Sequence, residues 1–394
     1  MKNRNALLFP RICFVLSILP FFIAGCMTAG QPQYASANVV ASLSGEMDEA
    51  FARAFEPIPF TFPRDHGAHP EYKTEWWYYT GNLADETGNQ YGYQLTFFRS
   101  ALTPELPARS SDLATNQIYL AHFAITDGRA DRHRSFERYS RGAGGLAGAE
   151  GEPLFSVWLE DWAVRESAPG VSRLQATVED ESGTYALDLT LHETRPPLLH
   201  GDQGLSQKGP EAGNASYYYS LVNLESRGTL TSAGRTFTVV GQSWMDHEFG
   251  TSALSENAVG WDWFSIQLDN GDALMFANVR TADDGVVPDF TGTYAAADGT
   301  QQSITTNDFA VTATNQWTSP DTEITYPSGW EVVFPDRKLV LTINPLVLDQ
   351  EMKVSFIYWE GAVTVEGTAA GAPVQGVGYV ELTGYGHSAG TYQR

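Results

Sequence analysis

The sequence of 394 residues contains only two cysteines, Cys13 and Cys26, and both lie near its beginning. The rest of the chain therefore has no thiol that could form a disulfide bond, bind a metal or attack a substrate. Lysine and arginine are also scarce, at 24 against 47 aspartates and glutamates, which gives a formal net charge of −23. This balance argues against nucleic-acid binding and against charge-driven binding to anionic lipid.

The sequence motifs of several common enzyme classes are missing too. There is no GxSxG motif of serine hydrolases, and the segment GLSQKG at 204–209 has a different spacing. Neither a Walker loop nor a dinucleotide-binding GxGxxG after a strand is present, and no residues have the HExxH or CxxC spacing of metal ligands. We therefore expect no metal and no cofactor.

The sequence has one long apolar run, ICFVLSILPFFIAG, which follows the basic start MKNR and ends before Cys26. Its ending resembles a bacterial lipobox, in which the cysteine is lipidated; the alternative is an ordinary signal peptide with an incidental cysteine. We expect a lipoprotein signal peptide at 1–25, lipidation of Cys26 and a tether at 26–57. Because Met27 is not an aspartate, the expected location is the bacterial cell envelope, at the periplasmic face of the outer membrane.

From Thr74 onward the sequence is typical of β-meanders. Short runs of aromatic and β-branched residues alternate with Gly, Asn and Asp, and helical periodicity is almost absent. Residues 75–99 and 261–280 each predict a ring-rich hairpin that closes on an arginine. An all-β fold of two packed antiparallel barrels follows, with domains at 58–250 and 251–394.

The ends of the two halves also match. The segment GQSWMDHEFG at 241–250 aligns with GVGYVELTGYG at 376–386, which places Trp244 with Tyr379 and Asp246 with Glu381. Asp246 and Glu248 should share a strand face with Trp244, while His247 points to the opposite face. The triplet at 246–248 suits acid/base chemistry, and a structural polar network is the alternative.

The second hairpin suggests a buried acid. Asn270-Gly271 predicts a two-residue turn that pairs residue 269 with residue 272. Asp262 would then be the single charge on an apolar face, and Arg280 would lie by Trp261. An unpaired buried carboxyl stays protonated or finds a partner.

The first hairpin has a longer turn. It should place Glu75 opposite Arg99 and Trp77 opposite Phe97. A cross-strand salt bridge at the mouth of a barrel is the favoured interpretation of the first pair. The next expected strand contains His122, which we interpret either as a satisfied core histidine or as part of a binding surface.

Together, the motifs EWWYYTGNL, LAHFAITD, SYYYSLVNL, GQSWMDHEFG, GWDWFSIQLDNG and GYVELTGY resemble the carotenoid 1,2-hydratase (hydroxyneurosporene synthase) superfamily, and within it the AttH-like secreted branch, often labelled predicted secreted hydrolases. The resemblance covers residues 60 to 386. It implies two lipocalin-like barrels with an apolar cavity near their interface, and it implies addition of water to a double bond of an acyclic carotenoid or another isoprenoid. The family's D-H motif falls on Asp246 and His247, and its W-D-W element on Asp262.

These assignments predict a mechanism without a cofactor. Asp262 would protonate the double bond, His247 would take a proton from water, and Asp246 would orient His247. Indole rings would stabilise the intermediate cation. The expected substrate-binding residues are Trp76, Trp77, Tyr79, His122, Trp244, Glu248, Trp261 and Trp263.

Two other functions stay open. One is a lipid or lipoprotein carrier without catalytic activity, and the other is a secreted hydrolase, which the missing nucleophile motif disfavours. In each case the partner would be an apolar small molecule, with the membrane reached through Cys26. An Asp262 open to the cavity favours the enzyme, and one paired with an arginine favours the carrier.

Overall fold

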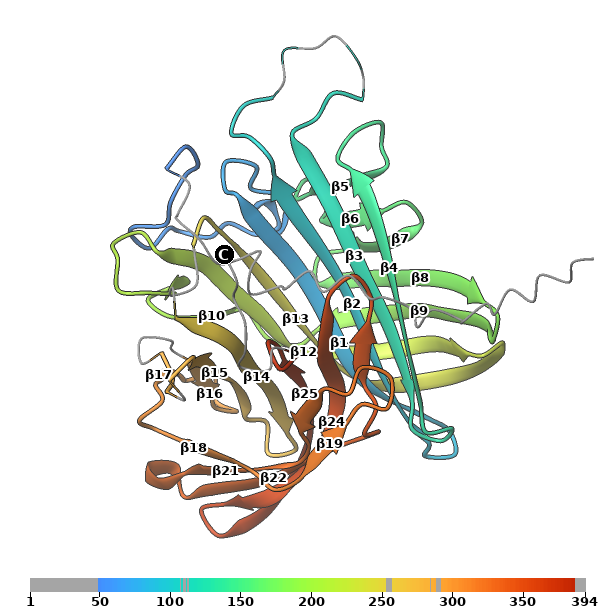
Figure 1. The fold of residues 1–394 in the computed structure, drawn as a ribbon, viewed down its shortest axis with the longest axis vertical. Coiled ribbons are helices and arrows are strands. Elements are labelled where there is room, and N and C mark those ends of the chain that lie inside the picture. Colours follow the sequence, from blue (N-terminus) through green and yellow to red (C-terminus); the bar gives the residue numbers. More distant parts are fainter. Residues whose placement is uncertain are drawn as a thin grey trace, which may run out of the picture. The chain divides into compact units, whose positions relative to one another are not determined.

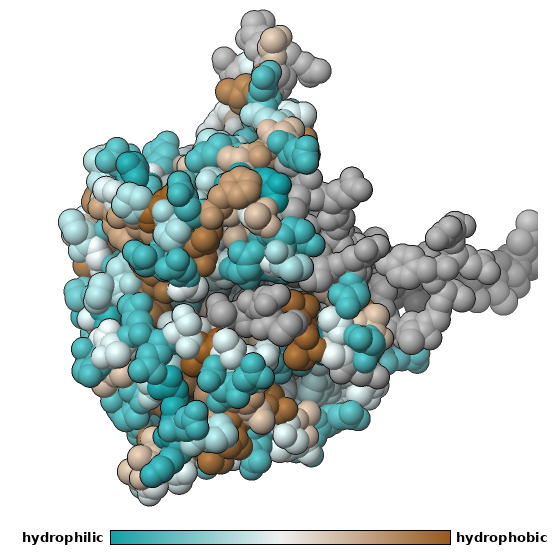
Figure 2. All heavy atoms as spheres, turned by 90° about the vertical axis from the view of Figure 1, so that its left-hand side faces the viewer, coloured by the Kyte–Doolittle hydropathy of each residue, from teal (hydrophilic) through white to brown (hydrophobic). Residues whose placement is uncertain are grey.

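The computed structural model describes residues 49–386, except 107, 109–110, 112, 253–256, 284 and 288–291. The expected signal peptide, Cys26 and most of the expected tether thus lie outside the described residues. In the part of the chain that is described, no helix is long and apolar enough to cross a membrane. The face drawn in Figure 2 is largely hydrophilic with small hydrophobic patches, in keeping with the excess of acidic residues.

The described residues form two large antiparallel sheets, which we call the first and the second barrel (Figure 1). The first barrel consists of β1 (Thr74–Asp85), β2 (Gln90–Ala101), β3 (Gln117–Asp127), β4 (Arg132–Arg141), β5 (Ala147–Glu150), β6 (Ser156–Leu159), β7 (Trp162–Ala168), β8 (Val171–Asp180), β9 (Gly183–Glu193), β10 (Leu198–Leu199), β11 (Leu205–Gln207), β12 (Ala215–Ser232) and β13 (Arg235–Gly250). Its strand order is β4-β3-β2-β1-β13-β12-β9-β8-β7-β6-β5, and the barrel nearly closes where β4 lies against β6.

The second barrel contains the strands of the second large sheet. They are β14 (Ala258–Leu268), β15 (Ala273–Thr281), β16 (Gly292–Ala295), β17 (Gln301–Ile304), β18 (Ala310–Ala313), β21 (Trp330–Phe334), β22 (Leu339–Pro345), β23 (Glu351–Lys353), β24 (Ile357–Ala369) and β25 (Ala372–Leu382). A separate hairpin joins β19 (Gln316–Thr318) to β20 (Thr325–Pro327), and η1 (Arg64–His66) and η2 (Pro335–Arg337) are short 3₁₀ turns. The all-β prediction of two packed barrels is confirmed.

The predicted repeat is visible in the pairing of the strands. In the first barrel, β1 lies between β2 and the last strand, β13; in the second barrel, β14 lies between β15 and the last strand, β25. Asp246 on β13 is paired with Tyr78, and Glu381 on β25 is paired with Trp263. The alignment of Asp246 with Glu381 is therefore confirmed. Each lies on the last strand of its barrel, opposite an aromatic residue on the first strand of that barrel's aromatic hairpin.

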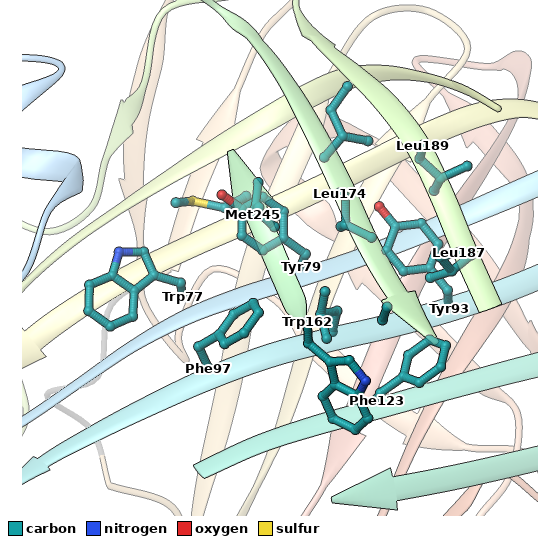
Figure 3. Close-up of a cluster of buried hydrophobic side chains, with 14 of the residues drawn as sticks. Trp77, Tyr79, Tyr93, Phe97, Phe123, Trp162, Leu174, Leu187, Leu189 and Met245 are labelled. Atoms are coloured by element: carbon teal, nitrogen blue, oxygen red, sulfur yellow. The ribbon is translucent and has the colours of Figure 1, made fainter. Parts of the chain in front are cut away.

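Side chains fill the interior of the first barrel. Alternation along β1 sends Trp77 and Tyr79 inward, where they meet Phe97, Met245 and other apolar side chains (Figure 3). A space bounded by His66, Tyr79 and Met245 measures about 10 Å³, which is room for about one water molecule. The interior is thus a packed core, and the opposite faces of these strands are left to meet the second barrel.

The two barrels meet through an apolar layer. Trp244 and Tyr78 of the first barrel belong to one buried cluster with Trp263 and Tyr379 of the second. The side chain of Asn82 also donates a hydrogen bond of 2.9 Å to the carbonyl of Gly378. The face of β1 and β13 that points out of the first barrel is therefore buried against the second barrel of the same chain.

Gly92 on β2 is a point of close approach between the barrels. A β-carbon added there would lie 2.5 Å from the Cβ of Ala362 on β24. We expect Gly92→Ala to lower the free energy of unfolding by about 1–3 kcal/mol, because neither backbone can move aside easily. Adding Ala362→Gly should restore most of the loss, with Ala362→Gly alone as the control. Urea unfolding checks this, and a double variant no more stable than Gly92→Ala would contradict it.

The register of the second hairpin differs from the prediction by one residue. Gln267 pairs with Ala273, and the backbone N–H of Leu268 donates to the carbonyl of Asp272 at 2.9 Å. Three residues, 269–271, therefore form the loop, and Gly271 adopts a positive φ of 90°. The reason is local: Asn270 accepts a hydrogen bond of 3.0 Å from the backbone N–H of Asp272, which favours a three-residue loop with glycine in the left-handed position. A one-residue slip moves every partner to the other face.

Candidate active site

A cavity of about 290 Å³ lies where the two barrels meet. This is roughly twice the 150 Å³ cavity that holds benzene in a well-studied case. One wall comes from β1, β2, β3, β12 and β13, and the other from β14, β15, β24 and β25. Its lining includes Trp76, Tyr78, Phe98, His122, Tyr218, Asp246, Glu248, Trp261, Trp263, Phe356, Tyr358, Glu360 and Glu381.

Strand pairing places the polar residues of the first barrel in one row. His122 lies opposite Thr96, Thr96 opposite Tyr78, and Tyr78 opposite Asp246. Neighbouring strands are about 4.8 Å apart, so His122 and Asp246 lie roughly 14 Å from each other across the wall. The row explains how residues distant in sequence reach one cavity.

Asp246 is a carboxyl group held among donors and aromatic rings. It is 4% exposed, accepts hydrogen bonds from Tyr218 Oη at 2.7 Å and Trp244 Nε1 at 2.6 Å, and is in short contact with Ser220 Oγ. Burial raises the pKa of Asp246 to about 7, although these three hydrogen bonds favour the charged form. At neutral pH this group is therefore able both to donate and to accept a proton.

Two more carboxyl groups line the opposite wall. Glu360 on β24 is the cross-strand neighbour of Glu381 on β25. Burial raises the pKa of Glu381 to about 7, and burial together with the charge of Glu381 raises the pKa of Glu360 well above its usual range. Glu381 accepts a hydrogen bond of 3.2 Å from the indole N–H of Trp261. The cavity thus holds acids that burial keeps partly uncharged.

These shifted groups predict how stability depends on pH. In the folded chain the pKa of Asp246 and of Glu381 is about 7, so both carboxyls keep their protons up to about pH 7. In the unfolded chain they lose these protons near pH 4. The folded state thus binds more protons in this window, and the free energy of unfolding should fall as pH rises through it. Asp246→Asn should flatten the slope by up to about 1.4 kcal/mol per pH unit. Urea unfolding at several pH values tests this; equal slopes would contradict it.

Asp262 does not lie in the cavity. The corrected register places Arg280 on its face, where Arg280 Nε lies 3.0 Å from Asp262 Oδ1 and Tyr385 donates a hydrogen bond of 2.9 Å to the same atom. Burial raises the pKa of Asp262, but Arg280 and Tyr385 oppose the shift. The guanidinium of Arg280 stacks on Tyr385 at 3.9 Å, not on Trp261 as expected. The sequence left open whether this carboxyl finds a partner or stays protonated, and the structure shows a partner. The position of Asp262 outside the cavity does not support its expected role as the catalytic acid.

His247 points away from the cavity into the first barrel, as its position in the triplet predicts. Its Nε2 lies 2.8 Å from Glu75 Oε1, and its Nδ1 lies 2.8 Å from Tyr219 Oη. Trp77 and Tyr79 also belong to the barrel core, because they share its inward face. These three residues therefore do not contact the space where a substrate would lie.

The remaining expected residues are closer to the cavity. Trp76, Trp261, Trp263, His122 and Glu248 line it, as expected for substrate-binding residues. Trp244 is buried just behind the lining. Both interpretations of His122 hold in part. As a core histidine it is buried, which lowers its pKa to about 3, and its Nδ1 lies 2.8 Å from the hydroxyl of Tyr358. As part of a binding surface it lines the cavity.

The predicted pair Glu75–Arg99 forms a buried network. Arg99 Nε lies 2.7 Å from Glu75 Oε2, and neither side chain is exposed. Burial alone would raise the pKa of Glu75, but hydrogen bonds from His247 and His69 and the charge of Arg99 lower it below its usual range. The favoured interpretation as a cross-strand salt bridge is confirmed.

His69, Glu75 and His247 also have ligand atoms within 4.8 Å of one another. Both histidines already bond to Glu75 Oε1, at 2.9 and 2.8 Å. Burial alone would lower the pKa of His69, but the hydrogen bonds that it donates to Asp65 and Glu75 raise this pKa to about 9. His69 is protonated, Arg99 lies beside Glu75, and Arg64 lies 2.8 Å from Asp65. Three cations thus surround the two carboxylates, so we interpret the cluster as structural.

Comparison with known proteins places the chain in a family. Residues 53–385 match the family model described as AttH-like. The chain belongs to the AttH-like family. The solved structure of a putative AttH from Nitrosomonas europaea is 33% identical, with 85% of this chain and 99% of that chain covered and a TM-score of 0.74. The predicted family and the lipocalin-like fold are confirmed.

Two further similarities link the AttH-like chain to hydratases. Kievitone hydratase of Fusarium solani subsp. phaseoli is 25% identical over 224 residues, which are 55% of this chain and 61% of that protein. The crystal structure of kievitone hydratase from Nectria haematococca has a TM-score of 0.62 at 14% identity, covering 85% of this chain and 96% of that one. At this identity the structural likeness concerns the fold.

Several residues of the AttH-like cavity were not predicted as site residues. Tyr358 and Glu360 line the cavity and Ser220 contacts Asp246, but no spacing in the sequence marks these residues as functional. The signal for Glu381 was present, because the repeat aligns it with Asp246. A repeat that carries one functional carboxyl at its end predicts a second one at the equivalent position.

Proposed function

We propose that the protein is a hydratase-type lyase, which adds water to a carbon–carbon double bond of an apolar isoprenoid-type substrate. The observation that carries the proposal is the set of partly uncharged carboxyls, Asp246, Glu360 and Glu381, in a cavity lined by indole and phenol rings. Protonation of an alkene needs a carboxylic acid that an apolar site keeps neutral. The relative named kievitone hydratase supports the same class of reaction.

In the proposed reaction, Asp246 donates its proton to one alkene carbon and the other carbon becomes a tertiary cation. The oxygen of a water molecule bonds to this cation, and Glu381 accepts the proton that the added water loses. The alkene gains one water, and the proton is returned when Glu381 is deprotonated and Asp246 is reprotonated. Both carboxyls have a pKa of about 7, so one can be protonated while the other is charged.

The surrounding rings have a separate role in this proposal. Trp76, Trp261 and Trp263 line the cavity beside the carboxyls. The faces of indole rings attract cations, by about 0.5–2 kcal/mol each depending on exposure. A cation formed in this cavity would be stabilised by the faces of these rings.

The test is turnover in water labelled with heavy oxygen. Purified protein is incubated with kievitone or with an acyclic carotenoid, and organic extracts are analysed by mass spectrometry. A product heavier by one labelled water supports the hydratase, and the substrate that yields it decides between kievitone and a carotenoid. Absence of labelled product with both substrates, at protein concentrations that bind them, would refute the proposal for these classes.

A carrier of apolar molecules is the second candidate. The pairing of Asp262 with Arg280 favours it, since the acid first expected for catalysis is neutralised there. A carrier would return its ligand unchanged and tightly bound from the same incubations. Retained ligand with no labelled product would therefore select this function.

We propose further that the protein is anchored by lipid at Cys26 in the bacterial cell envelope, at the periplasmic face of the outer membrane. The lipobox-like ending IAGC supports this. Growth with an alkyne-bearing fatty acid should label the wild-type chain and leave Cys26→Ser unlabelled. Equal labelling of both chains would contradict the anchor.

A further inference from the structure

A buried hydrogen-bond chain runs from Asp246 to the second barrel. Ser220 Oγ contacts Asp246 Oδ1 and lies 2.6 Å from His200 Nε2. His200 Nδ1 lies 2.8 Å from Oγ1 of Thr293 on β16. His200 and Ser220 are 0% exposed, and Thr293 is 2% exposed. The chain contains, in order, a carboxyl, a hydroxyl, an imidazole and a second hydroxyl.

The fold holds His200 firmly in this chain. The short strand β10 pairs with β12 so that Leu198 lies opposite Ser220. The backbone N–H of His200 then donates to the carbonyl of Tyr218 at 3.0 Å, and its carbonyl accepts from Gly204 at 2.9 Å. These bonds on both sides fix the position of the ring relative to Ser220.

Each member of the chain can reverse the direction of its hydrogen bonds. A hydroxyl both donates and accepts, and a neutral imidazole has one donor and one acceptor nitrogen, which exchange when the tautomer changes. With Asp246 charged, Thr293 donates to Nδ1, Nε2 donates to Ser220, and Ser220 donates to Asp246. With Asp246 protonated on Oδ1, all three bonds reverse. Only one proton is added, to Asp246, and His200 keeps one proton in both states.

We infer that His200 is a positioning residue that changes tautomer, and not charge, each time Asp246 gains or loses its proton. This inference rests on the proposed function for its role in turnover. It assigns His200 and Ser220 the task of satisfying both protonation states of the acid, which a fixed donor or a fixed acceptor does not do. An amide side chain, whose oxygen only accepts and whose nitrogen only donates, lacks this capacity.

The groups around His200 keep its ring neutral. Burial lowers the pKa of His200 to about 3, and the charge of Lys208 adds to the effect. The ring of Tyr218 packs on it with ring centres 4.2 Å apart. Because the imidazolium form is disfavoured near neutrality, the remaining response to Asp246 is a change of tautomer.

The groups that contact Asp246 also divide into those whose hydrogen bonds can reverse direction and those whose bonds cannot. Trp244 Nε1 only donates, so its hydrogen bond to Asp246 Oδ1 has the same direction in both protonation states. Tyr218 and Ser220 are hydroxyls and can adapt, while Glu248 raises the pKa of Asp246 by its charge. Asp246 in turn raises the pKa of Glu381 on the opposite wall.

The experiment is a nitrogen-15 NMR titration of the full chain labelled at histidine, from about pH 5 to about pH 9, with His200→Gln used to assign the signals. We expect the protonated nitrogen of His200 to change from Nδ1 to Nε2 as pH passes through about 7. Ser220→Ala and Asp246→Asn should each abolish this change. Ser226→Ala is the matched control, since Ser226 is a buried serine on the same strand, bonded to Ser243.

One tautomer at every pH, or an imidazolium near neutrality, would overturn the inference, because Tyr218 alone would then adapt to the proton on Asp246. If His200→Gln does not fold, Thr293→Val removes the last partner and assigns the signals instead. The titration needs no substrate, so it decides the inference even if no hydration is found. Where turnover is measured, Ser220→Ala should lower kcat roughly tenfold with little change in KM, and Ser226→Ala should lower neither.

Discussion

Asp246→Asn should lower kcat for hydration by about a hundredfold to ten-thousandfold and leave ligand affinity within about threefold. The amide keeps the shape of the carboxyl and can still accept a hydrogen bond from Trp244. It has no acidic proton, so the step that forms the carbon–hydrogen bond loses its donor. Turnover and binding are measured separately, with the same substrate in labelled water and by quenching of the cavity tryptophans.

Asp262→Asn is the matched control for this prediction. It makes the same change from carboxyl to amide on β14 of the second barrel, but Asp262 lies with Arg280 and Tyr385 outside the cavity. Its kcat should stay within about threefold of the wild type. Loss of turnover in Asp262→Asn with normal turnover in Asp246→Asn would reverse the assignment and restore the role first expected for Asp262.

The contrast between these two aspartates shows what could be predicted from the sequence. The all-β fold, the repeat and the pairing of Glu75 with Arg99 follow from periodicity and from aligned motifs, which are local properties of the chain. The residues of β15 that share a face with Asp262 depend on a single residue in the loop at 269–271. A register error of one residue exchanges the core and cavity faces of the partner strand, so Arg280 could not be foreseen beside Asp262.

The rest of the site depends on contacts that no spacing records. His200 and Thr293 are 93 residues apart in sequence, and they meet only because the barrels pack against each other. Glu360 is buried beside Glu381 through the pairing of β24 with β25. The pKa of such groups is set by this burial, and burial is a property of the packed molecule.

The largest loss of stability should come from Arg99→Met. Arg99 donates to Glu75 at 2.7 Å, to Gln117 at 2.7 Å, and to the carbonyls of His69 and Tyr72 at 2.9 Å each. Its removal leaves the fully buried carboxylate of Glu75 without its arginine partner and removes the side-chain donor of the Tyr72 carbonyl. We expect the free energy of unfolding at pH 7 to fall by about 3–5 kcal/mol, measured by urea unfolding.

A double-mutant cycle separates the charge pair from the loss of packing. If Glu75→Gln is added to Arg99→Met, residue 75 no longer carries a buried charge, and the double variant should be less destabilised than the sum of the single variants. The control pair is Arg173 and Asp188, which also lie on adjacent strands but are 56% and 44% exposed, so Arg173→Met should cost at most about 1 kcal/mol. Equal costs at the two arginines would mean that burial does not govern these pairs. Burial makes Glu75 depend on Arg99, and burial also keeps Asp246 partly uncharged. The cavity wall offers Asp246 hydroxyl and indole donors, and among the described residues no cation is in direct contact with its carboxyl group.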